Sequence, residues 1–187
     1  MRKLLYYIII LAATACTRQR EDVVNLPPET YITSTDTALH NVNGTWFLWQ
    51  AAFSGFITEK QDGALIAKLP VINGRENGTA YGWYVSGHPK YQRGFLNGNR
   101  EGEHRGWYEN GTVAFEFTFH NDKYEGVQRT FFENGQPWQT LNYLQGKEEG
   151  KQKSWNDSGR VVNNFTVKNG KLYGVIGRYD CMSVNKK

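Results

Sequence analysis

The chain has 187 residues, of which 39% are hydrophobic and 14% aromatic. Its 22 Lys and Arg residues face 18 Asp and Glu residues, for a net charge of +4. The positive charge is not gathered into a basic stripe, so the sequence excludes nucleic acid as a partner.

Residues 1–15 have the layout of a secretory signal. A basic head, Met1-Arg2-Lys3, precedes an uncharged run from Leu4 to Ala13 that is too short to span a bilayer. The ending Ala12-Ala13-Thr14-Ala15-Cys16 resembles a bacterial lipobox, in which the cysteine is diacylated. We therefore expect a membrane anchor of two acyl chains at Cys16; the alternative is an ordinary secretory signal.

The charge and the cysteines fit a lipid-anchored body. Removing Arg2 and Lys3 leaves 20 basic against 18 acidic residues, or +2, for residues 16–187. If Cys16 carries lipid, Cys181 has no partner, and no disulfide is expected.

Residues 16–43 are predicted to form a lipidated flexible tether, because they are polar, contain Pro27-Pro28 and lack apolar periodicity. Arg20-Glu21-Asp22 resembles the signal that sends some lipoproteins of Gram-negative bacteria to the cell surface. We expect an outer-membrane location, on the cell surface or on the periplasmic face. Asp36-Thr37-Ala38 is similar to a periplasmic O-glycosylation sequon, so Thr37 is a candidate glycosylation site.

Residues 44–77 are predicted to form an N-terminal capping β unit. The run Trp46-Phe47-Leu48-Trp49 and the segment Phe53-Ser54-Gly55-Phe56 are too apolar to be left in water. An open sheet edge invites aggregation, and such a unit would cover it. The alternative is a patch that docks on a partner or a membrane.

The sequence of residues 78–181 repeats at a constant interval, the one that separates Gly78 from Gly102. Residues 182–187 form a short tail. The column that opens each unit is Gly78, Gly102, Gly126, Gly150 and Gly174. Later in each unit comes an aromatic column of Trp83, Trp107, Phe131, Trp155 and Tyr179. Turn signals such as Asn110-Gly111 and Asn97-Gly98 divide each unit into two strands.

The parity of the strands selects the turn at Asn110-Gly111. A three-residue loop, Glu109-Asn110-Gly111 with Gly111 left-handed, puts Trp107 on one face with Val113, Phe115, Phe117 and Phe119. The aromatic column is therefore expected to form the core. The predicted fold class is all-β: a linear antiparallel meander of β-hairpins in a single-sheet repeat array.

The run from Gly102 to Gly111, followed by Phe119 to Asp122 and Glu125-Gly126, resembles the bacterial variant of the MORN repeat. The resemblance covers roughly residues 53–179 and extends to MORN-variant lipoproteins of Gram-negative envelopes, some of which are labelled antitoxins. It implies a β-hairpin array that acts as a scaffold for protein or lipid contacts.

A second aromatic stripe is the candidate partner-binding surface. Tyr84, Tyr108 and Phe132 directly follow members of the first aromatic column and so point the other way, and Trp138 shares their parity. Such a stripe suits a protein partner or a sugar ring, unless the tether or the tail folds over it.

No residues are placed for catalysis, a metal or a cofactor. His40, His88, His104 and His120 lack metal-ligand spacing. Glu101, Glu125 and Glu149 lie near Lys123, Lys147 and Lys171, which predicts ion pairs along a rim, with a calcium site or a catalytic carboxylate pair as the alternatives. The sequence therefore predicts a non-catalytic scaffold that binds another protein in the cell envelope. The alternatives are a glycan- or peptidoglycan-binding module and an antitoxin or immunity protein.

Overall fold

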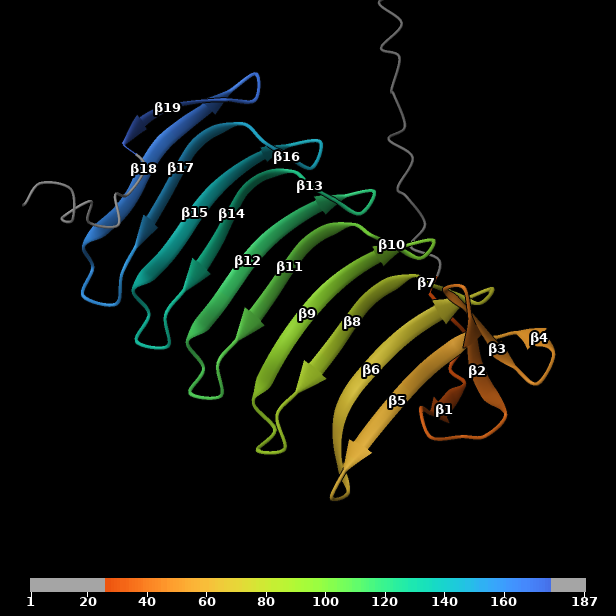
Figure 1. The fold of residues 1–187 in the computed structure, drawn as a ribbon. Coiled ribbons are helices and arrows are strands. Elements are labelled where there is room, and N and C mark those ends of the chain that lie inside the picture. The colour runs from red at the N-terminus through yellow and green to blue at the C-terminus, as the bar shows by residue number, and fades with distance from the viewer. Residues whose placement is uncertain (1–25, 176–187) are drawn as a thin grey trace, which may run out of the picture.

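A computed structural model describes residues 26–175, which contain strands and turns and no helix (Figure 1). The first strands are β1 (Tyr31–Thr33), β2 (Leu39–Val42), β3 (Thr45–Leu48), β4 (Ala51–Ala52), β5 (Gly55–Gln61), β6 (Ala64–Ile72) and β7 (Arg75–Glu76). The first two repeats hold β8 (Gly78–Trp83), β9 (Pro89–Leu96), β10 (Asn99–Arg100), β11 (Gly102–Trp107), β12 (Val113–His120) and β13 (Lys123–Tyr124). The remainder are β14 (Gly126–Phe131), β15 (Pro137–Leu144), β16 (Lys147–Glu148), β17 (Gly150–Trp155), β18 (Val161–Lys168) and β19 (Lys171–Val175).

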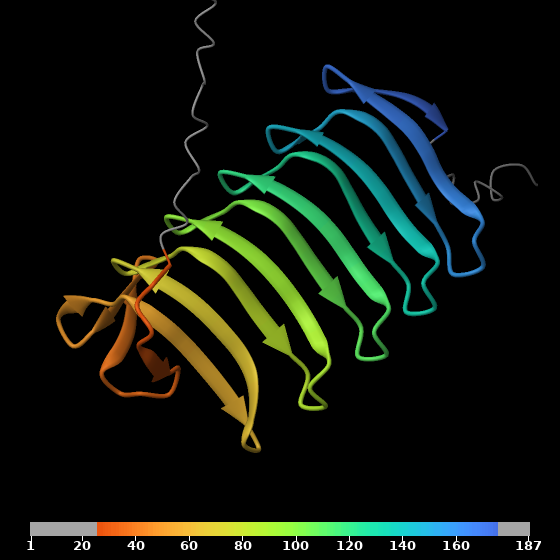
Figure 2. The same cartoon turned by 180° about the vertical axis from the view of Figure 1, so that it is seen from behind.

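One long sheet holds 16 of these strands in the order β1-β5-β6-β8-β9-β11-β12-β14-β15-β17-β18-β19, with β7, β10, β13 and β16 pairing at its margin. All neighbours in it are antiparallel except β1 and β5. The sheet stays open, and its hairpins follow one another along a row (Figures 1 and 2). This confirms the predicted all-β hairpin meander.

Each repeat turns twice, with different loops. The Tyr108 N–H donates to Thr112 O (2.8 Å), and Gly111, at φ +85°, donates to Tyr108 O (2.9 Å). This is the predicted three-residue loop Glu109-Asn110-Gly111. The return turn has two residues, Asn121 and Asp122, both at positive φ, which is the twist that a tight hairpin prefers.

A bulge after the three-residue loop overturns the predicted faces. Trp107 pairs with Val113, but Gly106 pairs with Phe115, so β12 holds one extra residue. Directly paired residues share a face of the sheet. Phe115, Phe117 and Phe119 therefore lie with His104, whereas Trp107 lies on the opposite face with Arg105 and Glu116.

The prediction that the aromatic column forms the core with these phenylalanines is therefore wrong. The same shift occurs in the other three hairpins of the array. The described members of the column are all half-buried: Trp83, Trp107, Phe131 and Trp155. Tyr179 lies outside the described residues. We call the face with Phe95, Phe115, Phe117, Phe119, Tyr124 and Tyr143 the ring face, and the other the polar face.

Glycine makes room on the ring face for the rings. A Cβ at Gly106 would lie 2.1 Å from a carbon of the Phe115 ring, and one at Gly82 would lie 2.2 Å from Tyr91. A side chain at either position would force the opposing ring to move. The glycines thus let a ring lie directly over the backbone of the neighbouring strand.

Side chains complete the backbone ladder between repeats. β12 pairs first with β13 and then with β14. Between these pairings the Glu125 N–H still donates to Thr118 O (3.0 Å), and the chain bows away from β12 from Gly126 onward. Gln128, 3% exposed, fills the gap: its Oε1 accepts the Thr118 N–H (2.8 Å) and its Nε2 donates to Thr118 O (3.3 Å). Its amide thus takes the place of a peptide unit in the ladder.

In other repeats, residues that stand at the position of Gln128 bridge further gaps in the backbone ladder. Gln152, 0% exposed, accepts the Asn142 N–H (3.1 Å) and donates to Asn142 O (2.9 Å). His104 contacts Gly94 O through Nε2 (2.8 Å). In the first gap the apolar Ala80 stands one period before His104, and Pro70, which has no N–H to satisfy, stands one period before Gly94.

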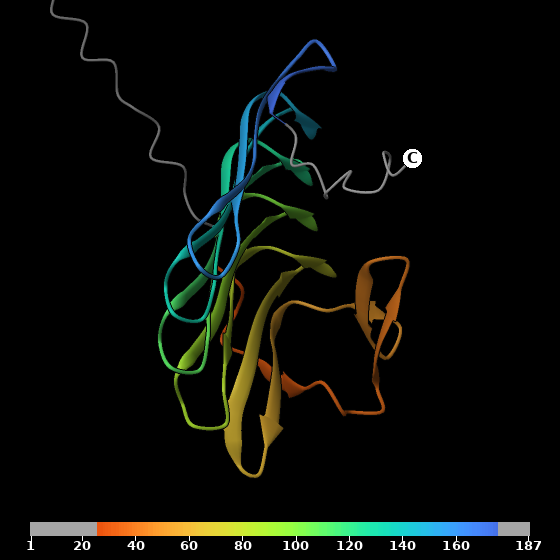
Figure 3. The ribbon, with the colours of Figure 1, turned by 60° about the vertical axis from the view of Figure 1, so that its left-hand side comes forward.

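The N-terminal residues correct the predicted tether. Residues 31–33 and 39–42, which the sequence assigned to it, form β1 and β2. β1 covers the outer edge of β5, and β2, β3 and β4 form a three-stranded sheet set off to one side of β5 and β6 (Figure 3). The folded part thus begins before residue 44, where the capping unit was expected to start.

The small sheet packs on the ring-face side of the first hairpin. Leu39, Phe53, Ile57 and Val71 form its buried core, with Ile32, Trp46, Leu48 and Leu69 packed against them. Trp46 also hydrogen-bonds the Glu76 carboxylate, and burial raises the pKa of Glu76. The end of the array is thereby closed by sheet pairing and by apolar contact.

Replacing Gln128 with Leu should lower the free energy of unfolding by roughly 1–3 kcal/mol, because the buried Thr118 N–H loses its partner. Urea titration measures the change. Arg129→Leu is the control, since this neighbouring side chain is exposed, and its effect should stay within about 0.5 kcal/mol. Equal effects of the two variants would contradict a structural role for the glutamine amide.

Candidate binding faces

The ring face carries a continuous chain of aromatic contacts. Ring centroids are 5.7 Å apart for Phe95 and His104, 4.6 Å for His104 and Phe119, and 4.6 Å for Phe119 and Tyr124. Tyr124 extends the chain to Tyr143 at 5.1 Å. Most of these rings are half-buried, and burial raises the pKa of the Tyr143 hydroxyl. The rings form a layer that is partly withdrawn from water.

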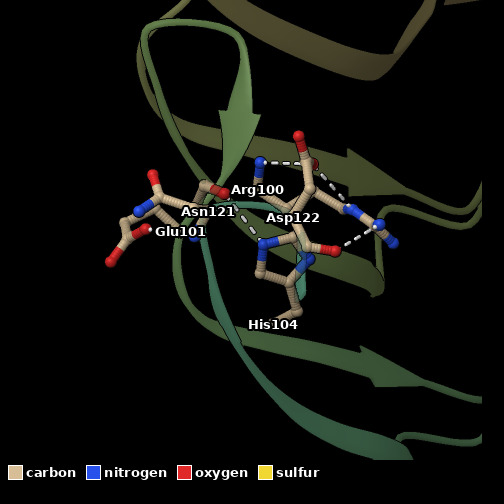
Figure 4. A network of polar contacts seen from close by, with 6 residues as sticks. Arg100, Glu101, His104, Asn121 and Asp122 are labelled. Carbon is tan, nitrogen blue, oxygen red and sulfur yellow. Dashed lines mark hydrogen bonds and ion pairs between the residues drawn. The ribbon is translucent and has the colours of Figure 1, made fainter. Parts of the chain in front are cut away.

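A hollow of about 290 Å³ opens on this face among Arg93, Phe95, Arg100, His104, Phe115, Phe117, Phe119 and Tyr124. The Arg100 guanidinium lies 4.3 Å from the Phe119 ring centre, and Arg93 lies 4.4 Å from that of Tyr91. Arg100 is paired with Asp122 at 3.1 Å (Figure 4). Arg93 has no ion pair in the described part of the chain. The hollow thus combines apolar walls with a cation that forms no direct ion pair, although the Glu76 carboxylate interacts with it at longer range.

His104 lies buried in this hollow, 3% exposed. Its pKa is held below the ordinary 6.5, chiefly because burial disfavours the imidazolium; the nearby Arg93 and Arg100 act in the same direction. The bond to Gly94 O opposes the shift. At neutral pH the ring is therefore uncharged and donates its Nε2–H to Gly94 O.

The glutamates of the column Glu101, Glu125 and Glu149 accept hydrogen bonds from backbone N–H groups instead of pairing with lysine side chains. Glu101 accepts the Asn121 N–H (3.0 Å), and Glu125 accepts the Gln145 N–H (2.8 Å), each in the return turn of the next repeat. The Asn121 N–H lowers the pKa of Glu101. Among residues 26–175 no ion pair joins this column to Lys123, Lys147 or Lys171, so the predicted rim of ion pairs is wrong. The carboxylates instead tie each turn to the preceding repeat.

The four residues of the predicted partner stripe make contacts within the array. The hydroxyls of Tyr84 and Tyr108 donate to Trp107 O and Phe131 O of the next repeats, both at 2.8 Å. Phe132 packs against Trp138 with ring centroids 5.9 Å apart, and Trp138 is 46% exposed. The two tyrosines link repeats, and contact of any of the four with a partner stays a prediction.

The remaining candidates lie apart from both faces or outside the described residues. Thr37 is exposed between β1 and β2, at the rim of a hollow that also holds the 75% exposed Trp49. Its glycosylation stays a prediction. Cys16 falls before residue 26, so the lipid anchor is likewise untouched by the structure. The described residues hold no group of three or more His, Cys, Asp or Glu suited to a metal ion.

The ring face was missed in the sequence because its parity depends on the bulge. A signal was nevertheless present in Phe115, Phe117 and Phe119, which alternate with polar residues along one strand. A second signal was the buried column of Gln128 and Gln152, which recur one period apart. Neither pattern reveals which face the tryptophans occupy.

The fold and its inter-repeat contacts define an open β-hairpin repeat protein. Residues 100–121 and 124–145 each match the MORN repeat variant. The chain therefore contains two repeats of the MORN variant at these residues. No curated protein shows significant sequence similarity to it. Within residues 26–175, no helix has the length and hydropathy to cross a membrane.

Acid should weaken the fold through His104. A folded-state pKa below 6.5 means that the unfolded chain binds the proton more tightly, so the stability contributed by His104 is complete above pH 6.5 and falls as the pH drops below it. His104→Gln supplies the amide found in the next two repeats. Urea titrations between pH 7.5 and 5.5 should show a smaller loss of stability for this variant than for the wild type. Parallel losses would contradict the assignment.

Proposed function

We propose that this protein is a non-catalytic scaffold of the bacterial envelope, anchored to the outer membrane by lipid at Cys16, and that its ring face binds a protein partner. The observation that carries the proposal is the chain of buried and half-buried rings from Phe95 to Tyr143 on a single-layered sheet. In the described part of the chain, the small sheet β2-β3-β4 lies only at the first end of this face. Contiguous, partly exposed apolar surface of this kind is typical of protein interfaces.

The chemistry of the partner is suggested by the small sheet itself. It packs on the array through Leu39, Trp46 and Leu48, so this side of the array already receives the apolar face of another β-sheet. Farther along, the apolar wall is joined by the unpaired Arg93. A protein surface with apolar side chains and a neighbouring carboxylate fits both features, and aromatic residues with arginine are enriched at such interfaces.

Crosslinking tests the ring face directly. A photo-crosslinking amino acid at position 117, on the ring face, should give one discrete adduct in intact cells, whereas the same group at position 118, on the polar face, should not. The matched double variants are Phe117→Lys with Leu141→Lys on the ring face, and Thr118→Lys with Thr140→Lys on the polar face. The first should abolish the adduct formed from a crosslinker at position 115, and the second should leave it. Adducts of equal yield at 117 and 118, or an adduct insensitive to the first variant, would contradict the proposal.

The lipid anchor has its own test. Cells fed labelled palmitate should label the wild-type chain and fail to label Cys16→Ser, which should also leave the membrane fraction. Cys181→Ser is the control and should label like the wild type. Labelling of Cys16→Ser would contradict the anchor without bearing on the ring face.

A further inference from the structure

The polar face of the last two repeats carries an uncompensated group of lysines. Its members are Lys147, Lys151, Lys153, Lys168 and Lys171. None of them forms an ion pair within residues 26–175, and all except Lys153 are exposed. We call this group with Trp155 the lysine face.

The earlier repeats neutralise the same positions. Arg105 pairs with Glu103 at 3.2 Å and with Glu116 at 3.8 Å, and Arg129 reaches Glu116 at 3.8 Å. Lys153 stands one period after Arg129, but Thr140 and Asn164 stand where Glu116 would recur. Lys151 occupies the position that Glu103 holds two repeats earlier. The carboxylates have thus been replaced while the cations remain.

Two of the lysines oppose one another directly. Lys168 on β18 pairs with Lys171 on β19, and like charges at directly opposed positions destabilise a sheet. The nearest acidic column does not relieve them, since Glu149 accepts the Asn169 N–H at 3.1 Å and Glu148 lies on the ring face, paired with Tyr143. Lysine does protect exposed edge strands from pairing, but Lys151 and Lys153 lie on β17, inside the sheet. The charge group therefore extends beyond what edge protection requires.

We propose that the lysine face binds an acidic polysaccharide. Lys153 Nζ lies 4.7 Å from the centre of the half-buried Trp155 ring, over one face of the indole. Between the lysines the face carries neutral hydrogen-bonding side chains, Thr140, Asn164 and Thr166. Ammonium groups pair with the carboxylates of the sugar chain, the exposed part of the indole offers apolar contact to a sugar ring, and the hydroxyls and amide bond sugar hydroxyls.

An acidic peptide fits this face less well than a sugar chain. Peptides that bind a sheet gain affinity chiefly by adding a strand at an open edge. β17 and β18 are paired on both sides, so the surface around Lys151, Lys153 and Trp155 offers side chains and no free backbone. A ligand that is recognised through its own hydroxyls and carboxylates is the better match.

The test measures binding of polygalacturonate oligomers to the full chain, with dextran as the neutral sugar and polyglutamate as the acidic chain without sugar rings. Polygalacturonate should bind, dextran should not, and polyglutamate should bind more weakly. Lys151→Gln with Lys153→Gln should weaken polygalacturonate binding about tenfold, because two charge-assisted contacts are lost. Trp155→Leu should also weaken it.

Arg105→Gln with Arg129→Gln is the matched control, because these cations occupy the same face earlier in the array and are already paired; its binding should equal that of the wild type. Circular dichroism and urea titration establish that each variant is folded. The proposal is overturned if polygalacturonate does not bind, or if the lysine and arginine variants weaken it equally. If polyglutamate binds as tightly as polygalacturonate and Trp155→Leu binds both as the wild type does, the polysaccharide proposal is overturned in favour of an acidic protein ligand. None of these outcomes bears on the crosslinking at position 117, which concerns the other face.

Discussion

A single sheet of repeated hairpins depends on how it bridges the gaps between repeats. Each return turn carries the chain away from the preceding strand, and a backbone N–H is left there without a main-chain partner. In the third and fourth repeats a buried glutamine amide bonds both the N–H and the C=O of the residue across the gap. An unpaired buried backbone group costs free energy comparable to a lost hydrogen bond, so these side chains keep the sheet continuous. Pro70, in the first gap, has no N–H to satisfy.

The rest of the inter-repeat contacts reinforce this ladder at both margins. At one margin Glu101 and Glu125 accept N–H groups from the next return turn. At the other, the hydroxyls of Tyr84 and Tyr108 donate to carbonyls of the next repeat. Each repeat is thus held by its neighbour through short-range bonds, as expected for a quasi-linear array. The arrangement leaves both faces of the sheet available along most of its length in the described residues.

The two faces differ in chemistry because of the bulge at Ala114 and its equivalents. The ring face collects phenylalanine and tyrosine, with glycine opposite the rings at Gly82 and Gly106. The polar face collects Trp83, Trp107 and Trp155 together with charged residues, balanced around Glu116 and cationic around Lys153. A partner protein on one face and an acidic polysaccharide on the other would place the array between two envelope components, and the two proposals are tested separately.

The repeat, the all-β hairpin architecture and the three-residue loop could be predicted from the residues alone, because glycine positions and turn dipeptides act locally and recur in each unit. It could not determine which side chains share a face. One extra residue in β12 reverses the parity between Trp107 and Phe115, and nothing in the local sequence distinguishes a bulged strand from a regular one. The strands at residues 31–33 and 39–42 were likewise hidden, since β1 is formed by pairing with β5, which lies well beyond it in the chain. The composition of the two faces, the buried glutamine column and the small sheet over the first hairpin became visible in the folded chain, because each depends on contacts between distant segments.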